Sequence, residues 1–238
     1  MANYELGVVN SAWTRFHVAS VTKAFTAAAI LLLAERGKLS LDDSVSRHLP
    51  AYPNGDRIRI KHLIKHTAGI PNLGSGSDWA RQERLPHITE ELVALFKDLP
   101  LDFEPGSQSR YSNSNYNLLT LIIEKVSGQS YESFLRENIL TPLGLRTIVD
   151  GSDMTRLVPN RATGVEPAGI RDVRLPRFID WSSRRGSGSL VTTASDLDRF
   201  VEALYGGKLL QPASLAKLQA PAEGFAYGWA RGSASAVS

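Results

Sequence analysis

The chain has 238 residues, of which 42% are hydrophobic and 21% are charged, an ordinary balance for a globular protein that argues against extensive disorder. Lysine and arginine number 27 against 24 acidic residues, so the formal net charge is only +3 and we expect no nucleic-acid partner. Cysteine is absent, which excludes a disulfide framework, a cysteine nucleophile and a thiolate metal site.

The chain shows no sign of a membrane-spanning segment. The longest apolar run, AFTAAAILLLA, is about half as long as the ~20-residue stretch that crosses a bilayer. No signal peptide is recognisable, because the first residues, MANYELGVVN, already alternate like a strand. We expect no membrane span, and the cellular location stays open.

The first part of the chain predicts two extended segments and one long helix. Residues 2–9 alternate like a strand, and TRFHVAS brings a second extended segment up to Ser20. The pattern from Ser20 to Arg36 is helical, with Gly37 well placed as its C-terminal cap. Because this helix is apolar on nearly every side, we expect it to be buried.

The middle of the chain, from about residue 41 to 177, predicts several helices separated by turns. The clearest helix is NYNLLTLIIEKVSG, in which apolar residues recur four positions apart before Gly128. SYESFLRENIL predicts another helix, which Thr141-Pro142 stops.

The last part of the chain begins with a Gly/Ser loop, RRGSGSLV. A capping box, with Thr193 as N-cap and Asp196 at the third helical position, predicts a helix start. FAYGWA resembles the start of a strand. Without an internal repeat or low-complexity linker, the sequence predicts one cooperative unit.

Ser20 and Lys23 form an S-x-x-K pair on the first turn of the long helix. Positions i and i+3 share a helix face, so the Ser20 hydroxyl and the Lys23 amine can lie within hydrogen-bond distance. A serine becomes a nucleophile when a base takes its proton, and burial lowers a lysine pKa enough for it to be that base. A structural explanation also exists, since serine caps helices well. A second S-x-x-K, Ser214 to Lys217, lies between prolines, and we interpret it as surface.

Tyr111 and Asn113 form a Y-x-N pair just before a buried helix. A phenol near a lysine ammonium would ionise more easily and exchange protons with the serine and a leaving group. The amide of Asn113 can hold the lysine and a substrate carbonyl. Tyr52 and Asn54 match the same pattern, but the YPNG turn explains them.

The chain resembles the serine β-lactamase and penicillin-binding protein superfamily, and most closely its class C β-lactamase-like branch, which includes esterases and D-amino-acid peptidases. The resemblance is collinear over almost the whole chain. It is carried by TRFHVASVTKAFTAAAILLLAERGKLSLDDSVSRHLP, IKHLIKHTAGIPN, EPGSQSRYSNSNYNLLTLIIEKVSGQSYESFLRENILTPLGL and GSGSLVTTASDLDRFVEAL.

The resemblance implies an α+β fold, with an antiparallel β-sheet flanked by helices and a mostly helical subdomain. Residues 1–40 with 186–238 would form the sheet part, and residues 41–185 the helical part, of a single domain. The implied activity is acyl transfer to a serine, with a small ester or amide as substrate.

The resemblance also implies the roles of four residues. Ser20 would be the nucleophile, Lys23 its base partner, Tyr111 the proton relay and Asn113 the polar group on the substrate side. No cofactor is implied.

One part of the family pattern is missing. The family has a third motif, K-T-G or H-x-G, on a strand that supplies a backbone N–H to the oxyanion hole, and this chain has neither after AYGWARG. The family's N-terminal helix and first strand are missing as well. Two hypotheses follow: self-association completes the sheet edge, or the activity is impaired. The alternative function is a penicillin-binding relative that is acylated without turnover.

Other chemical patterns have weaker support. His62 and His66 stand four residues apart, as in some metal sites, but no H-E-x-x-H or third ligand accompanies them, so we expect no metal. No G-x-S-x-G occurs, which argues against an α/β-hydrolase. Of the tryptophans we expect most in the core, with Trp181 lining the cleft as the exception.

Overall fold

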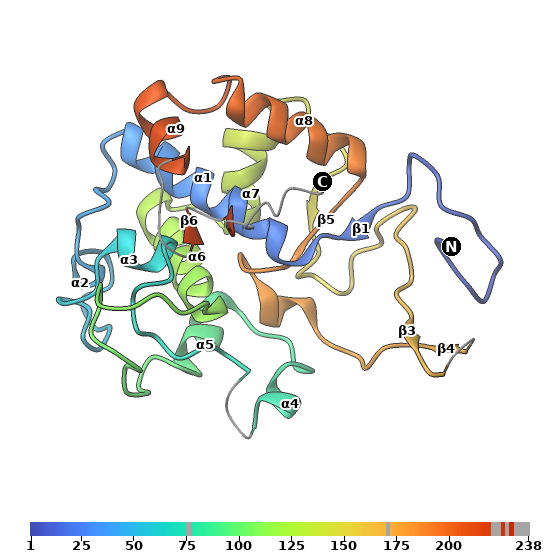
Figure 1. Cartoon of the computed structure of the whole chain (residues 1–238), viewed down its shortest axis with the longest axis horizontal. Coiled ribbons are helices and arrows are strands. Elements are labelled where there is room, and N and C mark those ends of the chain that lie inside the picture. Colours follow the sequence, from blue (N-terminus) through green and yellow to red (C-terminus); the bar gives the residue numbers. More distant parts are fainter. Residues whose placement is uncertain (75–77, 170–171, 220–224, 227–228, 231–238) are drawn as a thin grey trace, which may run out of the picture.

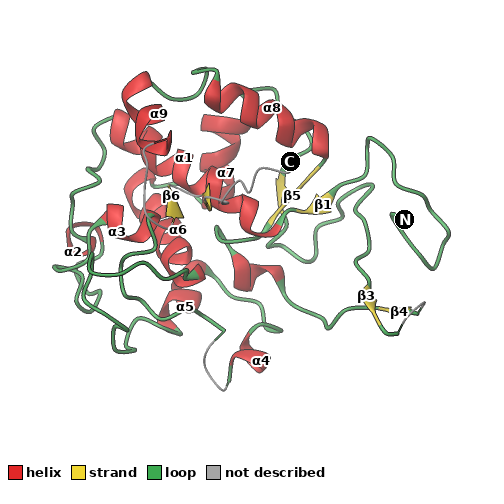
Figure 2. Cartoon of the chain, viewed as in Figure 1, coloured by secondary structure: helices red, strands yellow, loops and turns green. Residues whose placement is uncertain are grey.

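The computed structural model describes residues 1–74, 78–169, 172–219, 225–226 and 229–230 (Figures 1 and 2). The α-helices are α1 (Thr22–Glu35), α2 (Val45–His48), α3 (Ile60–Ile64), α4 (Trp79–Gln82), α5 (Thr89–Ala94), α6 (Asn113–Ser127), α7 (Tyr131–Leu135), α8 (Ala194–Tyr205) and α9 (Pro212–Gln219). Short 3-10 turns are η1 (Ala19–Val21) and η3 (Trp181–Arg184), and η2 (Arg136–Leu140) is π-helical. The strands are β1 (Phe16–His17), β2 (Val149–Asp150), β3 (Glu166–Pro167), β4 (Val173–Arg174), β5 (Leu190–Thr192), β6 (Phe225–Ala226) and β7 (Trp229–Ala230).

A three-stranded antiparallel sheet, in the order β1-β5-β2, joins three distant parts of the chain. His17 and Val149 both pair with Val191 of the central strand. The helices gather on one side of this sheet, while the N-terminal residues and the β3–β4 hairpin lie on the other side (Figure 1). The α+β class is thus confirmed, with a small sheet among the described residues.

The helix α1 crosses the centre of the helical part, where α6 and α7 pack against it (Figure 1). Every residue from Thr22 to Leu33 is buried, and Phe25 stacks on Phe200 of α8 with the ring centroids 3.7 Å apart. The expectation of a buried helix is confirmed, because a segment without a polar face has no side to present to water.

The helix α6 begins two residues earlier than its apolar pattern suggested. It starts at Asn113 and ends where Gly128 adopts a left-handed conformation, φ +71°. The Asn113 N–H is satisfied by Asn72 Oδ1 at 2.7 Å, which fixes the first turn. This start places the Asn113 side chain on the helix face toward α1.

The expected strand over residues 2–9 is wrong. Asn3 and Val8 form an isolated bridge, and the residues between them reverse the chain. The Asn3 side chain accepts a hydrogen bond from Leu6 N at 2.9 Å, and Gly7 has φ +64°. This local side-chain bond and the left-handed glycine close a turn in spite of the alternating pattern.

The predicted capping box at α8 is half formed. Thr193 Oγ1 accepts the Asp196 N–H at 3.3 Å, as expected. The Asp196 carboxylate instead accepts hydrogen bonds from Thr147 N and Oγ1, at 2.7 and 2.8 Å. The Thr193 N–H donates a hydrogen bond to Thr147 Oγ1 at 3.4 Å. Thr147 therefore takes over the return half of the box and ties α8 to the loop before β2.

Within the described ranges, none of the helices has the length and apolar character needed to cross a bilayer.

Candidate active site

Ser20 lies where β1 passes into α1. Its neighbour Ala19 has φ +44°, a backbone conformation that non-glycine residues rarely adopt and that is often found at functional sites. The turn is held to the central strand, because Val18 N donates to Leu190 O at 3.0 Å and Leu190 N donates to Thr22 Oγ1 at 3.1 Å. The strained turn leaves the Ser20 side chain exposed at a cleft.

Lys23 is the second residue of α1, three positions after Ser20 of η1, and only 2% of its surface is exposed. Its Nζ donates to Ser20 Oγ at 3.2 Å, to Asn113 Oδ1 at 2.8 Å and to the Ser187 carbonyl at 2.6 Å. Burial, followed by the positive charge of Arg184, lowers the pKa of Lys23 to about 7. The amine is therefore poised to lose its proton near neutral pH.

The phenol of Tyr111 shares a hydrogen bond with Ser20 Oγ at 2.6 Å and donates to Asn113 Oδ1 at 3.3 Å. Burial raises its pKa above the ordinary value, although the hydrogen bond with Ser20 and the charge of Arg184 act in the opposite direction. The phenol is therefore harder to ionise than an ordinary tyrosine, against the expectation of easier ionisation, because desolvation dominates. Tyr111 is a neutral phenol when Lys23 loses its proton.

The two candidate metal-binding histidines have structural roles. His62 Nδ1 accepts the Arg59 N–H at 3.2 Å and so caps α3. His66 is buried, its Nδ1 accepts the Ser112 N–H at 3.1 Å, and its ring packs on Tyr111 with centroids 4.7 Å apart. Burial lowers the pKa of His66 to about 3, so the ring is neutral. Over the described part of the chain, no three His, Asp or Glu residues gather as a metal site would require.

The Gly/Ser loop brings a backbone group to the site that the sequence did not reveal. Gly186 O accepts from Thr26 Oγ1 at 2.7 Å, and Arg185 O accepts from Asn117 Nδ2 at the same distance. These bonds place the next carbonyl, that of Ser187, against Lys23. The glycine and serine run was the only signal for this loop, and it carried no information about its contact.

A cleft of about 460 Å³ opens at Ser20. Trp181 lines it and stacks on His17 with centroids 3.7 Å apart, which confirms the expected exception among the tryptophans. Trp79 is half-buried: it packs against the hydrophobic core and also lines the cleft. Trp13 is 70% exposed, so the core expectation is wrong for Trp13. The Trp229 side chain lies outside the described residues.

The second S-x-x-K and the second Y-x-N do not form a comparable site. Ser214 of α9 is buried and Lys217 is exposed, so the surface interpretation is correct for the lysine and wrong for the serine. Asn54 has φ +54°, as expected for a turn, and Tyr52 is buried in the core.

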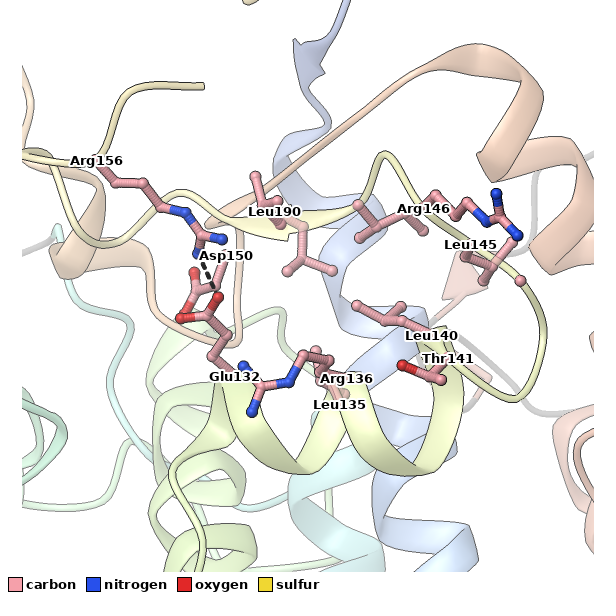
Figure 3. A pocket seen from close by; sticks show the side chains of 13 residues that line it. Glu132, Leu135, Arg136, Leu140, Thr141, Leu145, Arg146, Asp150, Arg156 and Leu190 are labelled. Carbon is pink, nitrogen blue, oxygen red and sulfur yellow. Dashed lines mark hydrogen bonds and ion pairs between the residues drawn. The ribbon is translucent and has the colours of Figure 1, made fainter. Parts of the chain in front are cut away.

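A second cavity, of about 430 Å³, lies between α7, η2 and β2 (Figure 3). Leucines line it from both sides, and an ion pair between Arg156 and Glu132 lies at one end. None of the Ser20 site residues lines this cavity.

The fold has close counterparts among solved structures. A penicillin-binding protein from Bacillus halodurans matches with a TM-score of 0.84 and 28% identity, covering 96% of this chain and 72% of that one. D-amino acid amidase from Ochrobactrum anthropi SV3, complexed with L-phenylalanine amide, matches with a TM-score of 0.82 and 26% identity, covering 92% of this chain and 63% of that one. The octameric penicillin-binding protein homologue from Pyrococcus abyssi matches with a TM-score of 0.80 and 28% identity, covering 95% of this chain and 55% of that one.

Fold and site together define a protein of the β-lactamase and penicillin-binding type, with a serine at the start of a buried helix. The chain belongs to the Beta-lactamase family, whose model matches residues 4–235. The resemblance inferred from sequence is confirmed. The chain spans 54%, 47% and 38% of the length of three curated relatives that are 35%, 33% and 36% identical to it.

Proposed function

We propose that this chain is a serine hydrolase that works through an acyl-enzyme on Ser20. The observation that supports this most strongly is the convergence of two proton-transfer groups on one hydroxyl. Lys23 Nζ and Tyr111 Oη lie 3.2 and 2.6 Å from Ser20 Oγ, and Lys23 is buried with a pKa near 7. This is the arrangement of an activated serine nucleophile.

In the proposed mechanism, neutral Lys23 takes the Ser20 proton as Oγ attacks the substrate carbonyl. The bond to the leaving group then breaks while Tyr111 passes it a proton, and the Lys23 ammonium returns a proton to Tyr111. Asn113 Oδ1 holds Lys23, which leaves its amide N–H₂ to donate to the substrate. Water then attacks the acyl ester while Lys23 takes its proton; the bond between the acyl carbon and Ser20 Oγ breaks, Lys23 returns the proton to Oγ, and a carboxylic acid leaves.

The proposed substrate is a small carboxylic ester or an amide, including β-lactam-like amides. Structural relatives named as an amidase and as penicillin-binding proteins support this range. The penicillin-binding relatives also favour a second candidate, in which Ser20 is acylated and the acyl-enzyme does not turn over.

The test is hydrolysis of p-nitrophenyl butyrate, nitrocefin and D-phenylalanine amide by the chain and by its Ser20→Ala variant, with intact mass recorded after each incubation. We expect turnover with one of these substrates and none in the variant. A Ser20 adduct without turnover would favour the penicillin-binding alternative. Equal activity of the two proteins would refute the assignment of Ser20.

The rate of acylation is expected to depend on pH with an acidic limb centred near 7. Below the Lys23 pKa of about 7 the amine is protonated and cannot accept the Ser20 proton, so the rate should fall about tenfold per pH unit. Stopped-flow acylation between pH 5 and 9 measures this limb. A limb near 10, the ordinary lysine value, would contradict the proposal.

Tyr111→Phe is expected to lower the acylation rate by about 10²-fold, the lower end of the range for general acid–base groups. The ring packing on His66 remains, so the thermal unfolding midpoint should change little. Tyr4→Phe, at an exposed tyrosine in the N-terminal turn, is the matched control. If both variants react alike, Tyr111 has no part in proton transfer.

We also propose that copies of the chain associate through a sheet edge. In the described sheet, β1 and β2 are the outer strands. Arg15, just before β1, already bridges to Arg161, so the edge of β2 is the one that favours pairing with another chain. The octameric state named for the Pyrococcus abyssi homologue is consistent with assembly in this fold. Light scattering coupled to size exclusion should give more than the 26.0 kDa of one chain, and a monomer at all concentrations would exclude it.

A further inference from the structure

A buried carboxylate, that of Glu83, forms part of the wall of the cleft. Glu83 follows α4, is only 2% exposed and forms ion pairs with Arg184, at 2.9 Å, and with Arg177. Its backbone carbonyl also accepts the Asp180 N–H at 2.8 Å. A carboxylate this deep is stable only when it is paired, so Glu83 fixes the η3 turn that carries Arg184.

Arg184 connects this carboxylate to the candidate site through its main chain. Its carbonyl accepts hydrogen bonds from Ser187 N, Ser187 Oγ and Gly188 N, at 2.9, 3.1 and 2.7 Å. The Ser187 carbonyl in turn accepts from Lys23 Nζ. The guanidinium of Arg184 packs over the Trp79 ring, 4.9 Å from the centroid, and lines the cleft together with Ser20. The backbone that contacts Lys23 is therefore anchored to Glu83.

We propose that Arg184, held by Glu83, is a positioning residue for Lys23: its main chain holds the carbonyl that Lys23 contacts, and its guanidinium places a positive charge in the same cleft. This inference rests on the proposed function, because it concerns the same proton acceptor. It extends that function to residues outside the S-x-x-K and Y-x-N patterns.

The surroundings of Lys23 indicate that the Glu83–Arg184 pair supplies the charge that acts on it. The groups that face it from the packed elements are Ser20, Tyr111, Asn113, Tyr116, His66 and the Ser187 carbonyl. Tyr111 and His66 are neutral near pH 7, since burial raises the pKa of the first and lowers that of the second. After burial, the charge of Arg184 is the next cause of the low pKa of Lys23.

The two members of the pair should act on Lys23 with opposite signs. Arg184→Met removes a positive charge and leaves the negative charge of Glu83. The protonated form of Lys23 is therefore stabilised, and its pKa rises. Glu83→Gln removes the negative charge that offsets the charge of Arg184, so the protonated form of Lys23 is destabilised and its pKa falls. A purely structural pair would not produce opposite shifts, because both losses loosen the same loop.

The experiment is a pH titration of the Lys23 ¹³Cε resonance in protein labelled at lysine, with Lys23→Met used to assign the signal. We expect midpoint shifts of about 0.5–1 pH unit, upward for Arg184→Met and downward for Glu83→Gln. Arg184→Lys keeps the charge, and its midpoint should stay within about 0.3 unit of the wild type. Circular dichroism confirms that each variant is folded, and Arg184→Lys covers the case in which a larger change unfolds the chain.

Glu132→Gln and Arg156→Met are the matched controls, because this second glutamate–arginine pair borders the separate cavity (Figure 3). Neither should move the Lys23 midpoint. Shifts of the same sign in Arg184→Met and Glu83→Gln, no shift in either, or a shifted midpoint in Arg184→Lys would overturn the inference. The titration requires no turnover: opposite shifts in a chain that never acylates Ser20 would support the inference and refute the proposed function.

Discussion

Lys23→Met is expected to lower the rate of Ser20 acylation by about 10²–10⁴-fold, the range for loss of a positioned general base. Methionine keeps the volume of the buried stem but cannot accept the Ser20 proton, and the pKa of Tyr111, which also contacts Ser20 Oγ, is raised by burial. Labelling by a fluorophosphonate, followed by intact mass, measures the acylation rate directly.

The same substitution is expected to leave stability unchanged or raise it by up to about 2 kcal/mol, as for other buried functional groups. The folded pKa of Lys23 is lowered, so the unfolded chain binds the proton more tightly and stability rises with pH between about 7 and the ordinary lysine value. Methionine removes this penalty below pH 7, although it leaves Asn113 Oδ1 and the Ser187 carbonyl without that donor. Urea unfolding at pH 6 and 9 tests this.

Lys217→Met is the matched control, since it changes the lysine of the second S-x-x-K on α9, where the side chain is exposed. It should acylate at the wild-type rate. If Lys23→Met also retains the wild-type rate, the base must be another group and the proposed mechanism is wrong.

Gly186→Ala is expected to destabilise the fold by about 3–4 kcal/mol and to abolish acylation in the fraction that folds. Gly186 has φ +67°, and an added Cβ would lie 1.7 Å from Thr120 Oγ1 of α6. Relief of this overlap must move the loop away from α6, which withdraws the Ser187 carbonyl from Lys23. Denaturant unfolding gives the free energy, and fluorophosphonate labelling gives the activity.

Gly128→Ala separates backbone strain from steric overlap. Gly128 has nearly the same conformation, φ +71°, and a Cβ there meets nothing within 4 Å. It should cost only about 1–2 kcal/mol, the usual cost of a left-handed alanine, and leave acylation intact. Equal losses in the two variants would show that Thr120 yields easily and that the close packing of the loop is unimportant.

The structure decided several features that depend on contacts between distant residues. Tyr111 meets Ser20 across 91 positions of sequence, and Arg184 meets Glu83 across 101. No periodicity encodes such contacts, since they arise from how α1, α6 and the Gly/Ser loop pack. The same limit explains the failed strand over residues 2–9, where an asparagine side chain and a left-handed glycine outweighed the alternation.

The sequence by itself determined the features that follow from local physics. An unbroken apolar pattern was enough to predict the buried helix α1, and helical spacing was enough to place Ser20 and Lys23 on one face. Tertiary structure alone decided the electrostatic state of that pair. The pKa of Lys23 depends on how completely the packed elements exclude water and on the charge of Arg184, and both are properties of the assembled fold rather than of any segment.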